Sequence, residues 1–387
     1  MRMVEWKKLT SVSDVLYGYP FESSLFTDDS NYIPLIRIRD IKPAKASTYY
    51  TGSILDDYII KKGDILVGMD GEFNLGKWGD RDGLLNQRVL KLKGKKTECV
   101  NGYLYHYLGP LFKKIEKETP GGSVKHLSAK IIKEIVIPIP SLSEQQRIVE
   151  QLDTFTSSIE NLKEQIAQRR KQYEYYRDQL YYPNKGALLK ASEDGKVEVK
   201  TLDEIGTFTR GRRFVRTDIV PEGVPCIHYG DMYTYYGISA DTTPTHLTKE
   251  IAAKLRFAKK GDVVIVAAGE NDIDIGVGVA WLGNEDVVVH DACFIYKHDM
   301  NPKYISHYLR SGNYHQQIRM GVVDGKICSI SAKELGRTLI PVPPLSEQQR
   351  IVSILDTFEA SINNLEQQLA QREKQYEYYR NKLLTFE

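Results

Sequence analysis

The chain has 387 residues and carries 53 lysines and arginines against 51 aspartates and glutamates. This length predicts two or three domains, and the 41% of hydrophobic residues is enough for buried cores, which excludes wholesale disorder. The near balance of opposite charges excludes binding by bulk charge alone.

Residues 1–136 are predicted to form a domain of short strands separated by turns. Strand-like runs cover 33–38, 64–67 and 87–92, a helix is expected near 102–117, and a last strand near 135–139. The amino-terminal sequence has no apolar region typical of a signal peptide, and no apolar run of the chain approaches the roughly 18 residues of a membrane span. We expect a mixed α/β domain with a curved sheet and a cytoplasmic location.

Residues 137–183 are predicted to form a long helix that needs a partner. Ser143–Gln146 is interpreted as its capping box. Apolar residues then alternate in steps of four and three, with Arg169 at one d position. The expected seam residues are Ile148, Leu152, Phe155, Ile159, Leu162, Ile166, Tyr173, Tyr176 and Leu180. Such a helix is about 60 Å long, too long for one compact domain to cover, so the pattern predicts a coiled coil.

Residues 184–339 are predicted to form a second mixed α/β domain, and 340–387 a second long helix. The strands are expected at 262–267 and 287–289 and the helical stretch at 302–319, starting at Asn301-Pro302. Residues 340–384 align without a gap to 137–181, always 203 positions apart, and 31 of the 45 pairs are identical. The second seam consists of Ile351, Leu355, Phe358, Ile362, Leu365, Leu369, Tyr376, Tyr379 and Leu383, and Arg372 corresponds to Arg169.

The chain is therefore a tandem duplication in which the helices stayed nearly fixed and the domains diverged. Landmarks such as Lys62-Gly63-Asp64 and Lys260-Gly261-Asp262 still correspond between the two domains. A parallel helix pair would require the second domain to carry the chain back along the full helix, so we expect an antiparallel pair with pseudo-two-fold symmetry. The matched arginines are either solvated exceptions or a device that sets the register.

Motifs of catalysis and metal binding do not occur in the sequence. It contains no phosphate-binding loop, no GxGxxG, no HExxH, no GxSxG, and no Asn/Asp-Pro-Pro-aromatic motif of amino-methyltransferases. Cys99, Cys226, Cys293 and Cys328 lie far apart without zinc-ligand spacing, which argues against metal ligation and a disulfide framework. We expect a non-catalytic chain that binds no cofactor or metal.

Cationic, aromatic and amide side chains near predicted turns are candidates for DNA contacts. Such groups neutralise phosphates or form paired hydrogen bonds with base edges, although each of them also fits a solvated surface or aromatic packing. In the first domain the candidates are Arg37, Arg39, Lys42, Tyr49, Tyr50, Lys77, Trp78, Arg81 and Lys125. In the second they are Arg210, Arg212, Arg213, Arg216, His228, Tyr229, Tyr233, Tyr235, Tyr236, Asn271 and Lys326. Residues 1–140 carry 22 basic and 17 acidic side chains, which is compatible with DNA binding.

The layout resembles the specificity subunit of type I restriction-modification systems. The resemblance spans essentially the whole chain and is carried by an I-P-x-P-x-L-S-E-Q-x-x-I-V motif at the entry into each long helix. Its residues are Pro138, Pro140, Leu142, Glu144, Gln145, Arg147, Ile148 and Val149, and Pro341, Pro343, Leu345, Glu347, Gln348, Arg350, Ile351 and Val352. Asn86-Gln87 is a weaker family-like element, and the second domain has His290-Asp291 near the corresponding position.

The resemblance implies a subunit without catalytic activity, in which each variable domain recognises one half of a split, asymmetric DNA sequence. It implies that the helices set the spacing between the half-sites and dock two methyltransferase (modification) subunits, which bind S-adenosylmethionine. ATP-dependent translocating nuclease (restriction) subunits, which use ATP and Mg, would join the complex. The alternatives are a coiled-coil adaptor that spaces two protein- or ligand-binding domains, and a stand-alone nuclease or methyltransferase.

Overall fold

The structure is a computed structural model that describes residues 4–119, 125–182, 197–270 and 272–386, with only the backbone of Tyr233. Contacts divide the chain into two compact units. Unit 1 comprises Met1–Lys163 and Gln368–Glu387, and unit 2 comprises Glu164–Gln367.

Unit 1 is built from small sheets. Strand β1 (Glu5–Lys8) pairs antiparallel with β11 (Val136–Ile139). An antiparallel sheet has the order β2 (Ser13–Tyr17), β10 (Val89–Gly94), β7 (Ile65–Gly68), β8 (Leu75–Lys77). A mixed sheet has the order β3 (Phe26–Thr27), β5 (Tyr49–Tyr50), β4 (Ile33–Ile36), β9 (Gly83–Leu85), β6 (Ile59–Ile60), and its β4 and β9 are parallel.

The helices of unit 1 pack an apolar face against these sheets. They are α1 (Leu9–Val12), α2 (Ile38–Ile41), α3 (Asn101–Glu118) and α4 (Ala129–Glu134), with 3-10 turns at Ser23–Leu25 and Asp56–Tyr58. The predicted helix near 102–117 is thus confirmed as α3. Its Tyr103, Leu104, Leu108 and Phe112 are fully buried and belong to the same cluster as Ile65 of β7, so α3 anchors the main core of the unit.

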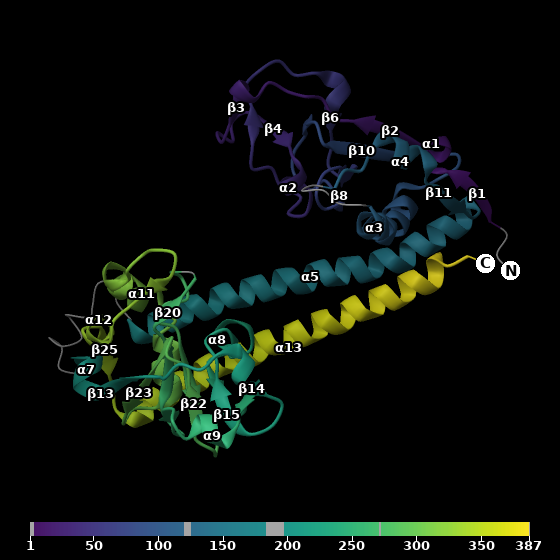
Figure 1. Cartoon of the computed structure of the whole chain (residues 1–387). Coiled ribbons are helices and arrows are strands. Elements are labelled where there is room, and N and C mark those ends of the chain that lie inside the picture. Colours follow the sequence, from purple (N-terminus) through teal and green to yellow (C-terminus); the bar gives the residue numbers. More distant parts are fainter. Residues whose placement is uncertain (1–3, 120–124, 183–196, 271, 387) are drawn as a thin grey trace. The chain divides into compact units, whose positions relative to one another are not determined.

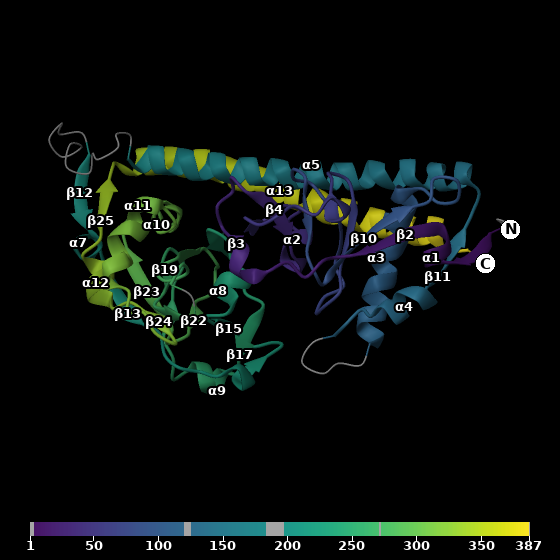
Figure 2. The same cartoon turned by 90° about the horizontal axis from the view of Figure 1, so that it is seen from above.

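Unit 2 repeats these sheets. Strand β12 (Glu198–Thr201) lies beside β25 (Leu339–Val342), with which it pairs antiparallel (Figure 2). One sheet has the order β13 (Gly206–Arg210), β23 (Cys293–His298), β19 (Val263–Val266), β21 (Gly278–Trp281), β16 (Ser239–Ala240). Another has the order β14 (Ile219–Val220), β17 (Thr245–Leu247), β15 (Val224–Ile227), β22 (Val287–Val289), β18 (Phe257–Ala258), in which β15 and β22 are parallel. Strands β20 (Ala268–Gly269) and β24 (Cys328–Ser329) form a further pair.

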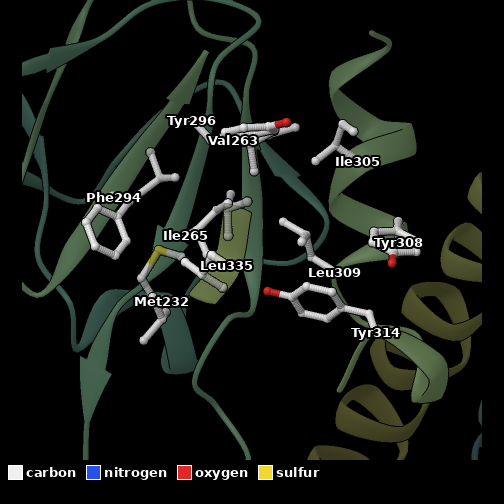
Figure 3. Close-up of a cluster of buried hydrophobic side chains, with 14 of the residues drawn as sticks. Met232, Val263, Ile265, Phe294, Tyr296, Ile305, Tyr308, Leu309, Tyr314 and Leu335 are labelled. Atoms are coloured by element: carbon white, nitrogen blue, oxygen red, sulfur yellow. The ribbon is translucent and has the colours of Figure 1, made fainter. Parts of the chain in front are cut away.

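The helices of unit 2 also cover a sheet. They are α7 (Leu202–Ile205), α8 (Asp231–Thr234), α9 (Lys249–Ala252), α10 (Pro302–Tyr308), α11 (Gly312–Ile318) and α12 (Ala332–Gly336), with 3-10 turns at Arg216–Asp218 and Arg319–Gly321. Figure 3 shows Ile305, Leu309 and Tyr314 directed from this helical layer toward Ile265 of β19. The predicted helix start is confirmed, because the Asn301 side chain accepts the N–H groups of Lys303 and Tyr304.

The matching strand orders confirm the predicted tandem duplication. The order β3-β5-β4-β9-β6 corresponds to β14-β17-β15-β22-β18, and β2-β10-β7-β8 corresponds to β13-β23-β19-β21. The helical stretch predicted near 302–319 consists of two helices, α10 and α11. Ser311 caps α11 by accepting the N–H of Tyr314, so a new helix begins there.

The two predicted long helices are α5 (Leu142–Tyr181) and α13 (Leu345–Leu384), and each unit holds a part of both. In unit 1 the end of α13 runs along the start of α5 (Figure 1), and Phe155 stacks on Tyr379 with ring centroids 5.2 Å apart. In unit 2 Tyr176 stacks on Phe358 at 5.4 Å. Early residues of one helix meet late residues of the other in both units, so the predicted antiparallel pairing is confirmed.

Ten of the eighteen predicted seam residues are buried, whereas Tyr176 and Tyr379 are exposed, so these two do not belong to a buried seam. The two exceptional arginines contact aromatic rings. Arg372 lies over the Phe155 ring at 5.8 Å, and Arg169 lies over the Phe358 ring at 5.9 Å. A half-buried guanidinium on a ring face keeps a favourable environment without a carboxylate partner. These contacts recur at corresponding positions of the two helix segments, as a residue that sets the register would require.

The predicted capping box is wrong by two residues. Helix α5 begins at Leu142, and the Ser141 hydroxyl accepts the N–H of Glu144 at 3.3 Å, so Ser141 rather than Ser143 is the cap. The second helix has Pro344 at the corresponding position. There the Pro344 carbonyl accepts the N–H groups of Glu347 and Gln348, and no side-chain cap is possible at that residue.

Candidate nucleic-acid interface

A basic cleft of about 510 Å³ lies at the carboxyl ends of the parallel strands β4 and β9 in unit 1. Arg37, Arg39, Lys42, Gln87 and Arg88 contribute to its lining. Polar side chains that follow two adjacent parallel strands converge at one sheet edge, which is where such sheets bind ligands. The structure thus brings three of the predicted DNA-contact residues together and adds two that the prediction lacked.

The cations of this cleft differ in how much they are engaged within the protein. Arg39 donates to the hydroxyls of Ser47 at 3.0 Å and Thr48 at 2.6 Å, and Lys42 forms an ion pair with Glu72. For Arg37 the structure gives no side-chain hydrogen bond or ion pair among the described residues. Arg37 is therefore the cation in this cleft best able to bind an external acceptor.

Several other candidates of the first domain serve the fold. Trp78 is 2% exposed and its indole donates to the carbonyl of Arg81, while the Arg81 guanidinium donates to the carbonyls of Ser30 and Tyr32. Tyr50 is buried. These side chains stabilise the sheet and the loops at its edge.

The remaining candidates of the first domain are spread over different surfaces. Tyr49 lies under the guanidinium of Arg81. Lys77 lies over the Tyr105 ring at 4.6 Å and near Asp153, on the side of the long helix. Lys125 donates to the Glu116 carbonyl at the end of α3. They do not join the basic cleft.

In unit 2 the arginine-rich segment after β13 is only partly free. Arg210 donates to the Asp291 carbonyl at 2.7 Å, and Arg212 donates to the Lys254 carbonyl at 2.8 Å. For Arg213 and Arg216 the structure gives no side-chain hydrogen bond or ion pair among the described residues, and both are exposed. These two remain the freer cations of the predicted cluster.

An aromatic cluster stands at the carboxyl ends of the parallel strands β15 and β22. The His228 ring lies 4.6 Å from Tyr229, 4.9 Å from His290 and 5.9 Å from Phe214. Burial lowers the pKa of both imidazoles below the usual value, so both are neutral at physiological pH. His290 Nε2 donates to the Phe214 carbonyl at 3.1 Å, so its role is structural. His228 Nδ1 accepts the Gly230 N–H at 3.3 Å, and for its Nε2 the structure gives no hydrogen-bond partner among the described residues.

The last candidates of the second domain differ in their exposure. Tyr235 is exposed, whereas Tyr236 is buried with its hydroxyl 2.7 Å from that of Thr243. Lys326 is exposed. Asn271 and the side chain of Tyr233 lie outside the described residues.

One buried glutamine in the first turn of each long helix attaches the domain to that helix, a role that the sequence prediction did not assign. Gln145 accepts the Val100 N–H at 3.0 Å and donates to the Pro140 carbonyl at 2.9 Å. Gln348 accepts the Asn301 N–H at 2.9 Å and donates to the Pro343 carbonyl at 2.8 Å. Each glutamine thus joins the start of a domain helix to the start of a long helix.

A buried histidine connects each domain with both helix segments of its unit. His106 lies 2.8 Å from an Asp153 oxygen through Nε2 and 2.9 Å from the Tyr376 hydroxyl through Nδ1. Burial lowers the pKa of this histidine. A neutral ring fits these partners, because Nε2–H donates to the carboxylate and Nδ1 accepts the phenol. The corresponding residues of unit 2 are His307, Asp356 and Tyr173.

The described residues contain no group of three or more histidine, cysteine, aspartate or glutamate side chains that could hold a metal ion. Within the same residues no helix is long and apolar enough to cross a membrane. The four cysteines are buried and free, and burial raises the pKa of Cys99 and Cys293 to about 12. These thiols are therefore core residues.

Comparisons with known proteins agree with the resemblance seen in the sequence. The family model described as the type I restriction modification DNA specificity domain matches residues 2–169 and again 194–373. The specificity subunit of the type I restriction enzyme EcoBI from Escherichia coli is 26% identical over 94% of this chain and 81% of its own. A putative type I specificity subunit from Haemophilus influenzae is 28% identical over 99% of this chain and 96% of its own.

Solved structures share the fold. The crystal structure of the S subunit of a type I restriction-modification system from M. genitalium has a TM-score of 0.60 at 17% identity and covers 99% of this chain and 97% of that one. A chain from a study of complex assembly and conformational transition of the type I R-M system has a TM-score of 0.53 at 17% identity and covers 98% of this chain and 96% of that one.

Proposed function

Because the chain belongs to the family of type I restriction-modification specificity subunits, we propose that each of its two domains recognises one half of a bipartite DNA target. Specificity subunits are non-catalytic parts of a restriction-modification enzyme, as the sequence predicted for this chain. The proposed domains are residues 1–136 and 184–339, with spacer helices in 137–183 and 340–387.

The observation that carries the proposal is that one fold occurs twice with different side chains at the same sheet edge. Unit 1 places Arg37 and Gln87 there, whereas unit 2 places His228 and Asp291. Two equal domains would select two equal half-sites. Two different ones select an asymmetric target.

The near-identical helices support docking of two copies of the same partner, the methyltransferase subunit. A groove of about 660 Å³ at the start of α5 is lined by Val4, Lys7, Pro140 and Leu142, among others. A groove of about 940 Å³ at the start of α13 is lined by the corresponding residues. They are Val197, Lys200, Pro343 and Leu345. A surface repeated with the same residues fits the same protein twice.

The remaining assignments concern the partners. In the proposed complex the methyltransferase subunits bind S-adenosylmethionine, and the restriction subunits, which translocate and cut DNA, use ATP and Mg. The proposal assigns no cofactor to this chain. The complex works in the cytoplasm, where its DNA is.

The experiment is methylome sequencing of a host that expresses this chain together with its methyltransferase partner. The proposal expects one split, asymmetric motif to become methylated. The absence of any split motif, with the complex assembled, would refute it. A second measurement is the affinity of the complex for duplex DNA at increasing salt concentration. Phosphate contacts make this affinity fall steeply, whereas a coiled-coil adaptor for other ligands would show no such fall.

A further inference from the structure

The two units place two loops at the same point of the fold, directly after their central parallel strands. In unit 1 the loops are residues 37–39 after β4 and 86–88 after β9. In unit 2 they are residues 228–230 after β15 and 290–292 after β22. We name each pair of loops the strand-exit site of its unit. The pairing Ile36↔Leu85 corresponds to Ile227↔Val289, which makes the positions equivalent residue by residue.

The backbone of the second loop is held in the same way in both units. The Asn86 N–H donates to the Ile36 carbonyl at 3.3 Å, and the His290 N–H donates to the Ile227 carbonyl at 3.2 Å. Both side chains are nearly buried. Position 86 and position 290 therefore shape the loop rather than contact a ligand.

Further backbone contacts complete the match. The Arg88 carbonyl accepts the Met69 N–H at 2.8 Å, and the Ala292 carbonyl accepts the Ala267 N–H at 2.8 Å. A glycine packs closely on the loop in each unit. A Cβ atom on Gly18 would lie 1.9 Å from the Asn86 carbonyl oxygen, and one on Gly211 would lie 2.2 Å from that of His290. No side chain fits at these glycines without displacing the loop.

The first loop is fixed by an aspartate in both units. Asp40 accepts the Arg37 N–H at 2.9 Å, and Asp231 accepts the His228 N–H at 3.3 Å. Asp40 is 1% exposed, so this carboxylate is committed to the loop. Both loops of the strand-exit site thus have equivalent backbone supports in the two units.

Above these equivalent backbone supports the side chains differ at every position. Arg37, Ile38 and Arg39 correspond to His228, Tyr229 and Gly230, and Gln87 and Arg88 correspond to Asp291 and Ala292. Two domains with different base preferences require this combination: the same backbone hydrogen bonds hold the loops, and different side chains face the ligand.

Unit 1 adds two observations at its strand-exit site. Arg88 has a φ of 71°, in the left-handed region that a residue with a side chain seldom adopts, and such backbone outliers gather at functional sites. Arg37 lines the basic cleft, and the structure gives it no side-chain partner among the described residues. An arginine with free guanidinium edges is suited to O6 and N7 of guanine in the major groove.

We propose that the strand-exit sites contact base edges and determine specificity, with Arg37 selecting a guanine in the half-site of the first domain and His228 acting in that of the second. This inference rests on the proposed function, because it names the residues through which each domain selects its half-site.

The test is methylome sequencing of complexes that carry Arg37→Gln or His228→Gln. The matched control is Lys96→Gln, which removes a charge from an exposed residue. Lys96 follows the end of β10, whereas the strand-exit loop 86–88 precedes its start. Thermal unfolding of each complex verifies that the variant is folded. We expect Arg37→Gln to relax one guanine position of the first half-motif by roughly tenfold or more. Arg37→Gln should leave the second half-motif unchanged. We expect His228→Gln to relax a position of the second half-motif and to leave the first unchanged. Lys96→Gln should change neither half-motif.

The outcomes separate this inference from the proposed function. If the wild-type complex gives no split motif, the proposed function fails. If it gives a split motif and Arg37→Gln lowers methylation equally at all sites without relaxing any position, Arg37 contacts phosphate and the inference is overturned. If Arg37→Gln changes neither the first half-motif nor the level of methylation, the inference is overturned as well.

Discussion

His106 and His307 lie at corresponding positions of the two domains and make the same two hydrogen bonds, each to an aspartate of one long helix and to a tyrosine of the other. Both rings are buried. A ring held from both sides fixes the orientation of the domain on the helix pair of its unit. Divergent recognition domains thus share one mode of attachment.

Tyr376→Phe tests this attachment in unit 1. The change removes the hydroxyl that donates to His106 Nδ1, which leaves a buried acceptor without a partner and costs about 1 kcal/mol. Hydrogen exchange of the amides in 101–118 should lose roughly fivefold in protection. Tyr378→Phe, at a tyrosine that is 60% exposed, is the control. Equal effects of both changes would contradict the role given to Tyr376.

Gln145→Ala tests the glutamine that joins α3 to the start of α5. It leaves the Val100 N–H and the Pro140 carbonyl without this partner in a buried site, so we expect a loss of about 1–3 kcal/mol in the free energy of unfolding, measured by urea denaturation. Gln146→Ala alters the next residue, which is exposed and bonds only Glu150 among the described residues. If Gln145→Ala were as mild as Gln146→Ala, the bridge would be dispensable.

Leu162→Lys tests the helix pair. Leu162 is 9% exposed, and a charge there has to be desolvated or the helices have to separate, at a cost of about 2–5 kcal/mol. We expect a lower melting temperature and reduced recovery of the methyltransferase subunit on co-purification. The same effects are expected for Leu365→Lys, and Ser157→Lys on an exposed face serves as control. Unchanged assembly of both leucine variants would refute the role of the seam.

Acidification should destabilise unit 2 through His298. Burial lowers the pKa of this histidine to about 4, whereas the unfolded chain has the ordinary value near 6.5. The unfolded state therefore binds the proton first. Stability is complete above pH 6.5 and falls as the pH drops from 6.5 to 4, by up to roughly 3 kcal/mol.

His298→Gln should make that part of the pH profile of unfolding shallower, because glutamine has no titrating group in this range and the other buried histidines keep their own contribution. Its effect should be confined to amides of unit 2 in hydrogen exchange. A wild-type profile that is flat between pH 6.5 and 4, or one that the substitution leaves unaltered, would contradict the assignment.

The parts of the fold that follow a long periodic pattern could be predicted from the sequence. The seam from Ile148 to Ile166 specified a helix and its apolar face, and the duplication specified the antiparallel pair. The ends of the helices were harder to predict. Ser141 and Ser143 both fit a capping pattern, and the hydrogen bond from the Glu144 N–H to the Ser141 hydroxyl decides between the two. The break between α10 and α11 depends on Ser311, a single capping residue within an otherwise helical pattern.

The candidate site could be predicted only by residue type. Composition singled out Arg37 as well as Trp78 and Arg81, but whether a cation is free depends on carbonyls that are distant in sequence, such as those of Ser30 and Tyr32 for Arg81. Gln145 was visible as a motif residue, yet its role required the position of Val100. Such tertiary contacts have no local sequence signal.

The most direct test of the central claim is to replace residues 197–339 with a second copy of residues 4–136 and to sequence the methylome. The first junction lies directly before β1 and β12, and the second lies in β11 and β25. Both domains attach to the helices through the same histidine and glutamine contacts. We predict that the asymmetric motif becomes a split palindrome made of the first half-site twice. Methylation that keeps the original second half-motif would contradict the claim that each domain recognises one half of the target.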